Sequence, residues 1–215
     1  MTQRLGAPLR NVCLTLLLLG SVSCPALADT PTTLGKPETE ANLPSPRAEM
    51  QIVLDQVVNA AVNFRGDDNK NKRREELRKI ISPKFDFQEM AMRALGTHWK
   101  LVTKEEQTEF IDIFSDLLAK TYLEKIETVE RNMVKIEGET LEYPKAIVRT
   151  SIRNESSVFP VNYKMLSGAD GWKVYDVVIE NIGLVANYRN EFAGIIRREK
   201  FSGLMKRLRE KDASS

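Results

Sequence analysis

The stretch FDFQEMAMRALGTHW, Phe85 to Trp99, concentrates large apolar side chains in a segment too short to form a helical core of its own. Asp86 is a typical N-cap residue, and Glu89, three positions later, completes the pattern of a capping box. Phe85 and Met90 occupy the two positions of a hydrophobic staple. The stretch therefore predicts a short capped helix, and Asp86 needs no catalytic role.

The segment that follows predicts a longer helix with more apolar surface than one buried face requires. Thr103 and Glu106 form a second capping box, and the helix is expected to run from about Lys104 to beyond Tyr122. Its large apolar residues cover an arc of about 180°, whereas a surface helix needs a stripe of roughly 100°. They are Phe110, Ile111, Ile113, Phe114, Leu117, Leu118 and Tyr122. Either this helix is buried on two sides, or one flank lies in the core and the other lines a cavity.

The apolar period changes from helical to two after about Thr128, which is typical of strands. Four segments show this period: RNMVKIEG, YPKAIVRTSIRN, SVFPVNYKMLSG and GWKVYDVVIEN. The stretch from Ser167 to Gly171 is a good hairpin turn between the last two. Both alternating sets of residues in the last strand are apolar, which predicts that this strand is central in the sheet.

Helices are expected before and after these strands. An amphipathic helix should run from about Arg47 to Arg65, and a charged helical segment follows it and stops at Pro83. Two apolar sets at helical spacing close the chain: Leu184, Tyr188, Phe192, Ile195 and Ile196, then Phe201, Leu204, Met205 and Leu208. This order predicts an α+β fold, with helices packed on a twisted antiparallel sheet of about four strands.

Residues 1–28 are expected to form a cleaved export signal. Arg4 and Arg10 precede an apolar run from Val12 to Val22, and small residues precede Asp29, where the mature chain should begin. A retained membrane anchor is one alternative, but the run is about half of the roughly 20 residues that span a bilayer. A lipoprotein acylated at Cys24 is another. Residues 29–46, rich in proline, are expected to be a disordered tether, and residues 47–215 a single domain.

Cleavage of the signal would remove both cysteines and the small excess of positive charge from the chain. Both cysteines, Cys13 and Cys24, lie in the signal, so the mature chain should form no disulfide and carry out no thiol chemistry. The signal also holds two of the 32 Lys and Arg residues, which leaves 30 against 30 Asp and Glu. A mature chain without excess positive charge argues against nucleic-acid binding.

The sequence carries little that points to catalysis. His98 is the one histidine, and no mature cysteine could join it as a metal ligand, so no metal site is expected. No glycine-rich phosphate loop, nucleophile elbow or zinc-protease helix is present. Asp176, between Tyr175 and Val177, is the one candidate buried acid. We therefore expect that the protein is not an enzyme and uses no cofactor.

Three segments resemble the MlaC family of periplasmic phospholipid-binding proteins, also called the toluene-tolerance family. They are FDFQEMAMRALGTHWKLVTKEEQTEFIDIFSDLLAKTY, GWKVYDVVIENIGLVANYRNEFAGII and FSGLMKRL, and the resemblance extends from about Arg47 to Lys211. The chain departs from the family pattern at Asn181 and Gly183, and at Lys200, where glycine is commoner, so the expected loop geometry there is altered.

The resemblance implies an exported soluble carrier that holds lipid acyl chains in an apolar cavity enclosed by the helices and the sheet. Such a carrier moves lipid between the inner and outer membranes of a Gram-negative envelope. The implied partners are an inner-membrane ABC transporter with a lipid-binding MCE subunit, and an outer-membrane lipoprotein associated with a porin. The ligand is expected to be a phospholipid, or a hopanoid as in a subset of the family.

The residues expected to line the cavity are the large apolar ones on these helix and sheet faces. They are Phe87, Met90, Leu95, Trp99, Phe110, Phe114, Leu117, Leu118, Tyr122, Val148, Ile152, Val161, Tyr163, Trp172, Val174, Tyr188 and Phe192. The alternative is an envelope adaptor of similar fold that carries no lipid, whose apolar faces are all used by the core and a protein interface.

The charge of the chain is distributed unevenly between two helical segments. Residues 197–211 hold seven basic and two acidic residues, whereas residues 104–130 hold eight acidic and three basic. Both could be ordinary solvated helix faces. Alternatively, Lys206, Arg207 and Arg209 dock on an acidic partner or on anionic lipid headgroups.

Overall fold

The structure is a computed structural model that describes residues 44–154 and 157–213. These residues belong to one compact unit of the chain, Pro37–Ser215. The predicted export signal, and the predicted tether up to residue 43, lie outside the described residues. Within the described ranges, no helix combines the length and the apolar character needed to cross a membrane.

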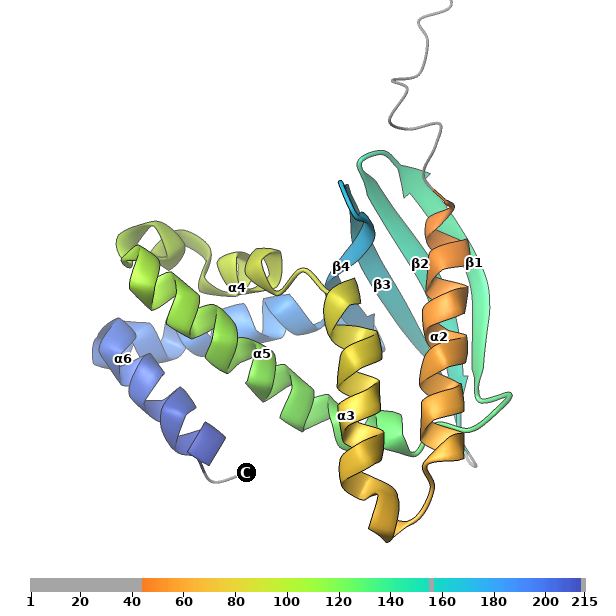
Figure 1. Cartoon of the computed structure of the whole chain (residues 1–215). Coiled ribbons are helices and arrows are strands. Elements are labelled where there is room, and N and C mark those ends of the chain that lie inside the picture. Colours follow the sequence, from red (N-terminus) through yellow and green to blue (C-terminus); the bar gives the residue numbers. More distant parts are fainter. Residues whose placement is uncertain (1–43, 155–156, 214–215) are drawn as a thin grey trace, which may run out of the picture. The chain divides into compact units, whose positions relative to one another are not determined.

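The described chain begins with two helices connected by a tight turn (Figure 1). Helix α2 spans Pro46–Asn63, and its N-cap is Ser45, whose hydroxyl accepts a hydrogen bond from a backbone N–H of the first turn at 3.0 Å. Helix α3 spans Lys70–Ile81 and continues into a 3₁₀ turn, Ser82–Lys84, that contains the proline predicted to stop it. Both helices therefore lie where the periodicity predicts them.

Helix α4, Phe87–Leu95, is capped by Asp86, whose carboxylate accepts from the backbone N–H of Glu89 at 2.9 Å. The predicted capping box is nevertheless wrong. The backbone N–H of Asp86 donates to the carbonyl oxygen of Val174 in the sheet at 2.8 Å, so it needs no bond from the Glu89 side chain. The Glu89 carboxylate pairs with Arg93 instead, at 2.5 Å.

Helix α5 follows α4 after a 3₁₀ turn, Gly96–Leu101, which begins where Gly96 ends α4 with φ 57°. It spans Lys104–Glu127. Its capping box is closed in both directions: the Thr103 hydroxyl accepts from the Glu106 N–H at 3.2 Å, and the Thr103 N–H donates to the Glu106 carboxylate at 2.8 Å. The second predicted capping box is thus confirmed.

The sheet is antiparallel, with strand order β1-β2-β3-β4-β5. The four predicted strands are present, and a two-residue strand adds to them. The bounds are β1 Val134–Glu142, β2 Lys145–Arg153, β3 Val158–Gly168, β4 Gly171–Ile179 and β5 Ile182–Gly183. Helix α2 lies against β1 and β2, as Figure 1 shows.

Strand β4 is internal in the strand order, as predicted, but one of its two edges is only partly paired. Strand β4 lies between β3 and the short β5, which pairs with only its last two residues. A bulge at Tyr175 shifts the register with β3, so Val177 joins Trp172 and Val174 in the same apolar cluster. The other side of β4 is covered by α4 and α6, and this cover explains why both faces are apolar.

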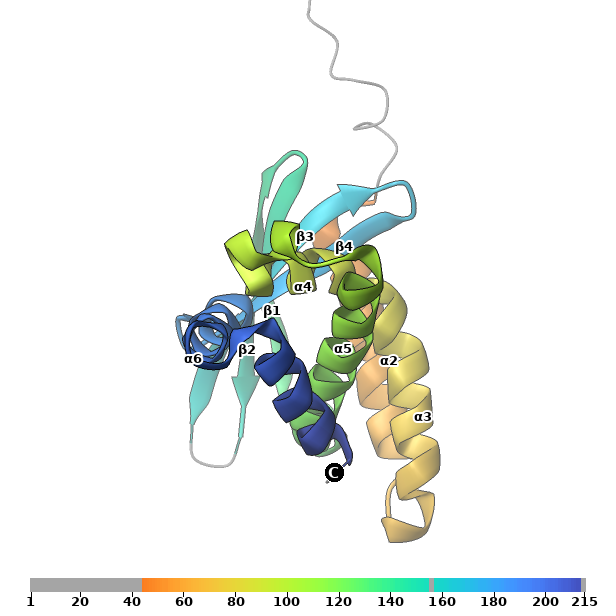
Figure 2. The ribbon, with the colours of Figure 1, turned by 90° about the vertical axis from the view of Figure 1, so that its left-hand side faces the viewer.

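Helix α6, Leu184–Ala213, bends sharply at Lys200, whose φ of 64° and ψ of 179° are not helical. We call the part after this bend, Phe201–Ala213, the C-terminal arm. Figure 2 shows that the arm turns back toward α5. Helices before the sheet, an antiparallel sheet and a helix after it confirm the predicted α+β fold.

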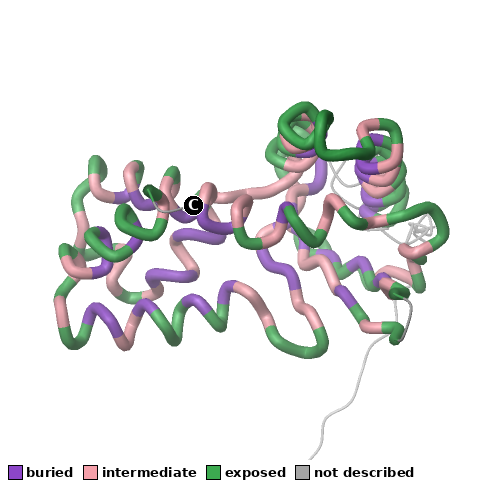
Figure 3. Tube along the Cα trace, turned by 90° about the horizontal axis from the view of Figure 1, so that it is seen from below, coloured by how far each residue is buried: buried purple, intermediate pink, exposed green. Residues whose placement is uncertain are grey.

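The core of the described residues consists of three clusters of buried apolar residues. Figure 3 shows buried stretches alternating with exposed ones along the helices. The helical cluster joins α4, α5 and α6. The sheet cluster joins α2 to β2, β3 and β4, and the third cluster joins α2, α3 and the end of α5. Phe85 packs against both the helical and the sheet cluster, so the stretch that precedes α4 connects the two larger cores.

Candidate functional site

A pocket of about 670 Å³ lies among α3, α5 and the C-terminal arm. Helix α5 contributes the middle of it, with α3 on one side and the arm on the other (Figures 1 and 2). Ile113, Leu117, Lys120 and Glu124 of α5 follow each other at a spacing of three or four, which places them on one face of the helix. The apolar lining consists of Ile113, Leu117, Leu123 and, from the arm, Leu208.

The rest of the lining is polar, and ion pairs connect the three helices around it. Arg74 of α3 pairs with Glu124 of α5 at 3.3 Å. Arg78, one helical turn further along α3, lies 3.6 Å from Asp116 of α5. The remaining polar lining residues are Glu75, Lys120, Thr121, Lys211 and Asp212. The site thus combines four apolar side chains with eight polar or charged ones, so it could contact both parts of an amphipathic ligand.

The C-terminal arm is attached to α5 by apolar and ionic contacts. Leu204, Met205 and Leu208 are buried. Near its end, the Lys120 ammonium donates to the Asp212 carboxylate at 2.8 Å and to the Asp212 carbonyl oxygen at 2.5 Å. Lys120 and Asp212 both line the pocket, so this ion pair forms part of its rim.

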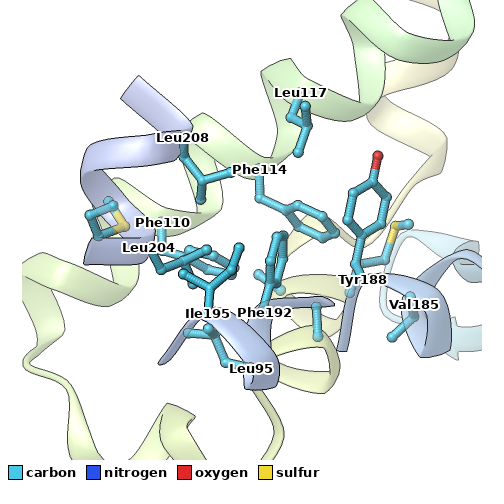
Figure 4. Close-up of a cluster of buried hydrophobic side chains, with 14 of the residues drawn as sticks. Leu95, Phe110, Phe114, Leu117, Val185, Tyr188, Phe192, Ile195, Leu204 and Leu208 are labelled. Atoms are coloured by element: carbon cyan, nitrogen blue, oxygen red, sulfur yellow. The ribbon is translucent and has the colours of Figure 1, made fainter. Parts of the chain in front are cut away.

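Aromatic rings of the helical cluster pack against one another, and Leu117 and Leu208 of the same cluster line the pocket (Figure 4). Phe114 and Tyr188 meet edge to face, with ring centroids 5.2 Å apart, and Phe110 meets Phe192 in the same way at 5.7 Å. Burial raises the pKa of the Tyr188 phenol, while a hydrogen bond with Thr121, a pocket residue, opposes that rise. The ring cluster therefore reaches the pocket at its polar edge.

The residues predicted to line one cavity lie in two clusters of the structure. Those from the helices belong to or pack against the helical cluster: Phe87, Met90, Leu95, Trp99, Phe110, Phe114, Leu117, Leu118, Tyr122, Tyr188 and Phe192. Those from the strands belong to or pack against the sheet cluster: Val148, Ile152, Val161, Tyr163, Trp172 and Val174. Of the whole set, Leu117 also borders the pocket.

Tyr163 is partly buried and packs against the sheet cluster. Burial raises the pKa of the Tyr163 phenol to about 12, against a hydrogen bond with Thr150 that acts in the opposite direction. Thr150, itself buried, donates from its hydroxyl to the carbonyl oxygen of Val161 at 2.7 Å. Val148 is fully buried beside these residues. Val148 and Thr150 are thus buried among neighbouring residues of the sheet, and the place of Val148 in a cavity wall stays a prediction.

Sequence reasoning missed the polar rim of the pocket. The apolar stripe of α5 contained a signal, because Ile113 and Leu117 were both part of the wide apolar arc. The other two sides of the pocket could not be predicted, because nothing in the sequence shows that Leu208 of the arm and Arg74 of α3 lie on either side of that stripe. The pocket is formed by residues far apart in the chain.

Asp176, the candidate buried acid, is held by contacts that stabilise the fold. Asp176 is 5% exposed, and its carboxylate accepts from the backbone N–H of Val185 at the start of α6, at 3.1 Å, and pairs with Lys164 at 3.1 Å. A carboxylate at that end of a helix stabilises it. Across residues 44–154 and 157–213, no three His, Cys, Asp or Glu side chains are grouped so that they could hold a metal ion.

The three predicted docking residues are exposed and are each close to a carboxylate. Their closest distances are 3.9 Å for Lys206 to Glu210, 2.7 Å for Arg207 to Glu199 and 2.6 Å for Arg209 to Glu109. The last pair joins the basic segment of α6 to the acidic segment of α5. Part of the charge that the sequence divides between two helices is therefore balanced between them in the fold.

The structure is that of an α+β protein with a pocket of mixed apolar and charged lining between α3, α5 and the C-terminal arm. The family model described as "MlaC protein" matches residues 51–210. The chain belongs to the MlaC family, which confirms the resemblance seen in its sequence.

A solved structure and a curated protein support this membership. The fold is similar to that of a phospholipid-binding protein from Ralstonia solanacearum in complex with a phospholipid, with a TM-score of 0.69 and 27% identity over 78% of this chain and 97% of that one. The chain is also 21% identical, over 140 residues, to the intermembrane phospholipid transport system binding protein MlaC of Haemophilus influenzae. That match covers 62% of this chain and 65% of the curated protein.

Proposed function

We propose that this protein is a lipid carrier that binds phospholipid acyl chains in an apolar cavity and shuttles lipid between the inner and outer membranes together with an ABC transporter system. The observation that carries the proposal is the likeness to the Ralstonia protein, whose structure contains a phospholipid and is covered almost completely by this chain. A pocket whose lining joins four apolar residues to charged side chains is consistent with it.

The energetics of lipid in water explain why a carrier is needed. A two-tailed phospholipid has about 30 methylene and methyl groups, and at roughly 0.8 kcal/mol each their exposure to water is unfavourable by about 24 kcal/mol. A bilayer provides almost the same apolar environment as a protein cavity. The carrier therefore has to bind the acyl chains about as favourably as the membrane does. The direction of transfer has to come from its partners.

The predicted lining residues remain our proposed wall of the acyl-chain cavity. The pocket beside α5 is the proposed entrance, because its apolar residues, such as Leu117, continue into the helical cluster. The side chains of that cluster are in mutual contact in the structure. Acyl chains that enter would therefore have to separate side chains that now contact one another. The helical and sheet clusters both contact Phe85, so the proposed cavity would extend from one cluster to the other past this residue.

The proposed location is the periplasm, reached by an export signal in residues 1–28 that is cleaved before Asp29. The proposed partners are an inner-membrane ABC transporter with an MCE subunit, and an outer-membrane lipoprotein with a porin. The name of the Haemophilus protein, a binding protein of an intermembrane phospholipid transport system, supports this assignment. The ligand is a phospholipid or a hopanoid, and no catalytic step or cofactor is involved.

Lipid extraction tests this function directly. The mature protein, purified without detergent, is extracted with organic solvent, and the extract is quantified by mass spectrometry. One or more phospholipid or hopanoid molecules per protein chain support the carrier. A protein that is empty after purification, and that takes up no lipid from phospholipid vesicles, would instead be the adaptor of similar fold.

A further inference from the structure

We propose that the Lys120 ammonium binds the phosphate group of the lipid. In the structure this ammonium is paired with the Asp212 carboxylate, and the phosphate would replace that carboxylate as its partner. Loading of the pocket would then release the last turn of the C-terminal arm. This inference rests on the proposed function, because it assigns the headgroup contact of the same site.

The position of Lys120 on the pocket fits a headgroup contact. Lys120 comes one helical turn after Leu117 on α5, and both residues line the pocket. Leu117 is buried, whereas the Lys120 side chain is 33% exposed, so the ammonium group lies between the buried Leu117 and solvent. A lipid whose chains contact Leu117 would have its phosphate at this boundary.

The present partner of Lys120 occupies the position that a phosphate would take. The ammonium group donates to two oxygens of the same residue, the Asp212 carboxylate at 2.8 Å and the Asp212 carbonyl at 2.5 Å. A phosphodiester likewise presents anionic oxygens that accept charge-assisted hydrogen bonds. The Asp212 side chain is 40% exposed, and ion pairs of such exposure are weak because solvent competes with them. An incoming phosphate can therefore displace the carboxylate.

Replacement of the Asp212 carboxylate by a phosphodiester leaves the net charge around Lys120 unchanged. The pocket lining holds the cations Arg74, Arg78, Lys120 and Lys211, and the acids Glu75, Glu124 and Asp212. When Asp212 leaves, the lining loses one negative charge beside Lys120, and a phosphodiester restores one. Without an anion, departure of Asp212 would leave Lys120 without its partner, so release of the turn and binding of the phosphate favour each other.

The movement required of the chain is small. Leu204 and Met205 are buried and hold the beginning of the arm to the helical cluster. Asp212 lies one turn beyond Leu208, close to the end of the helix, where few buried contacts oppose opening. Release of the last turn thus exposes the pocket beside Leu208 while the rest of the arm stays in place.

Two variants and two lipids test the exchange. Lys120→Gln removes the ammonium, and Asp212→Asn removes the competing carboxylate. Binding to the mature protein is measured by transfer from phosphatidylcholine vesicles that contain either a fluorescent phosphatidylglycerol or a fluorescent diacylglycerol with the same chains. Glu130→Gln, which breaks an exposed ion pair with Arg65 away from the pocket, is the control, and circular dichroism checks folding.

Lys120→Gln is expected to weaken phosphatidylglycerol binding about tenfold, the size of one hydrogen bond to a charged group, and to leave diacylglycerol binding unchanged. Asp212→Asn is expected to strengthen phosphatidylglycerol binding several-fold. Inorganic phosphate at millimolar concentration should not compete, because it lacks the chains that the apolar lining holds.

Several results would overturn the inference. They are equal effects of Lys120→Gln on the two lipids, weaker phosphatidylglycerol binding by Asp212→Asn, or competition by inorganic phosphate as strong as that of the lipid. A wild-type protein that takes up neither lipid would contradict the proposed function itself, so the two failures are distinguishable.

Discussion

The backbone N–H of Asp86 donates to the carbonyl oxygen of Val174 at 2.8 Å, which attaches the start of α4 to β4. The side chain of the same residue caps α4, and the residue before it, Phe85, packs against both large clusters. The apolar stretch that begins at Phe85 is therefore the place where the helices and the sheet are joined. Its large side chains pack within α4 and also connect the helical cluster to the sheet cluster.

Asp86→Ala should lower the free energy of unfolding by about 1 kcal/mol, because the N–H of Glu89 loses its capping acceptor while the backbone bond to Val174 remains. Urea denaturation followed by circular dichroism measures the change. Asp86→Asn is the matched control, since asparagine is an equally good N-cap. Equal destabilisation by both substitutions would show that the cap is not the cause.

A second prediction concerns the buried ion pairs between α3 and α5. Glu127, whose side chain is 7% exposed, accepts from both Arg73 and Arg74. Burial acts to raise the pKa of Glu127, but the hydrogen bonds from Arg73 and Arg74 outweigh it and hold the pKa below its ordinary value. A carboxylate with a lowered folded-state pKa stabilises the protein above its unfolded-state pKa, and this contribution disappears as the pH falls through the folded value.

Glu127→Gln should therefore destabilise the protein by about 3 kcal/mol at pH 7, because it leaves Arg73 buried without its charge partner. The difference from wild type should shrink as the pH falls below the ordinary glutamate pKa of about 4.3, because the unfolded chain then binds a proton that the folded carboxylate binds only at lower pH. Urea unfolding at pH 7 and pH 3 measures both values. Glu130→Gln, in an exposed pair, should change stability by less than about 1 kcal/mol at either pH. A loss in Glu127→Gln that is the same at both pH values would contradict the assignment.

Local sequence signals located most of the elements of this fold. The predicted capping residues Asp86 and Thr103 both accept the expected backbone hydrogen bonds, and the four strands follow the period of two. These features depend on neighbours within a few positions. The bulge at Tyr175 and the short β5 do not, because they depend on which strand pairs with which.

The candidate site was less predictable for the same reason. The sequence shows that α5 is apolar over a wide arc, but it does not show what covers each part. In the structure the arc is shared among the helical cluster and the pocket, whose wall includes Leu208, about 90 positions later in the chain. The pairing of Arg209 with Glu109 was likewise hidden, although both charged segments were recognised.

Lys200→Gly should stabilise the protein by about 1 kcal/mol. Lys200 has φ 64° and ψ 179°, a region that is essentially restricted to glycine and that costs other residues on the order of 1–3 kcal/mol. The greater freedom of glycine in the unfolded chain offsets part of this gain. Thermal and urea unfolding measure the change. Lys206→Gly, in the helical arm, should be destabilising by about 1 kcal/mol, and similar losses in the two variants would exclude a strained bend.

Carboxylates placed on the proposed cavity wall should reduce lipid occupancy. Leu118→Glu puts an unpaired charge among acyl chains, where it has to be desolvated or protonated. Val148→Glu does the same in the sheet cluster, but Val148 is fully enclosed by side chains in the structure, so we expect this variant to unfold when no lipid is bound. Lipid per chain is measured by extraction, in variants that retain their circular dichroism. Full occupancy in folded variants at several such positions would show that the proposed wall is wrong.

The last prediction concerns docking by the basic end of α6. Charge reversal of Lys206, Arg207 and Arg209 should slow lipid transfer to a partner or membrane at low ionic strength, because opposite potentials accelerate encounter. Bound lipid should remain in place, since these side chains are exposed and are not part of the pocket lining. The defect should become smaller as salt is raised, because salt screens exposed charges over about 10 Å at 0.1 M.

The ion pair between Arg209 and Glu109 complicates this test, because reversal of Arg209 also places two carboxylates side by side. The exchanged double variant, Arg209→Glu with Glu109→Arg, restores the pair and keeps the net charge, but it moves the positive charge from the arm to α5. If docking depends on the positive potential of the arm, the exchanged variant should transfer lipid more slowly than wild type while matching it in stability. Wild-type transfer by the exchanged variant and by the triple reversal, both at low salt, would mean that these residues form an ordinary solvated helix face.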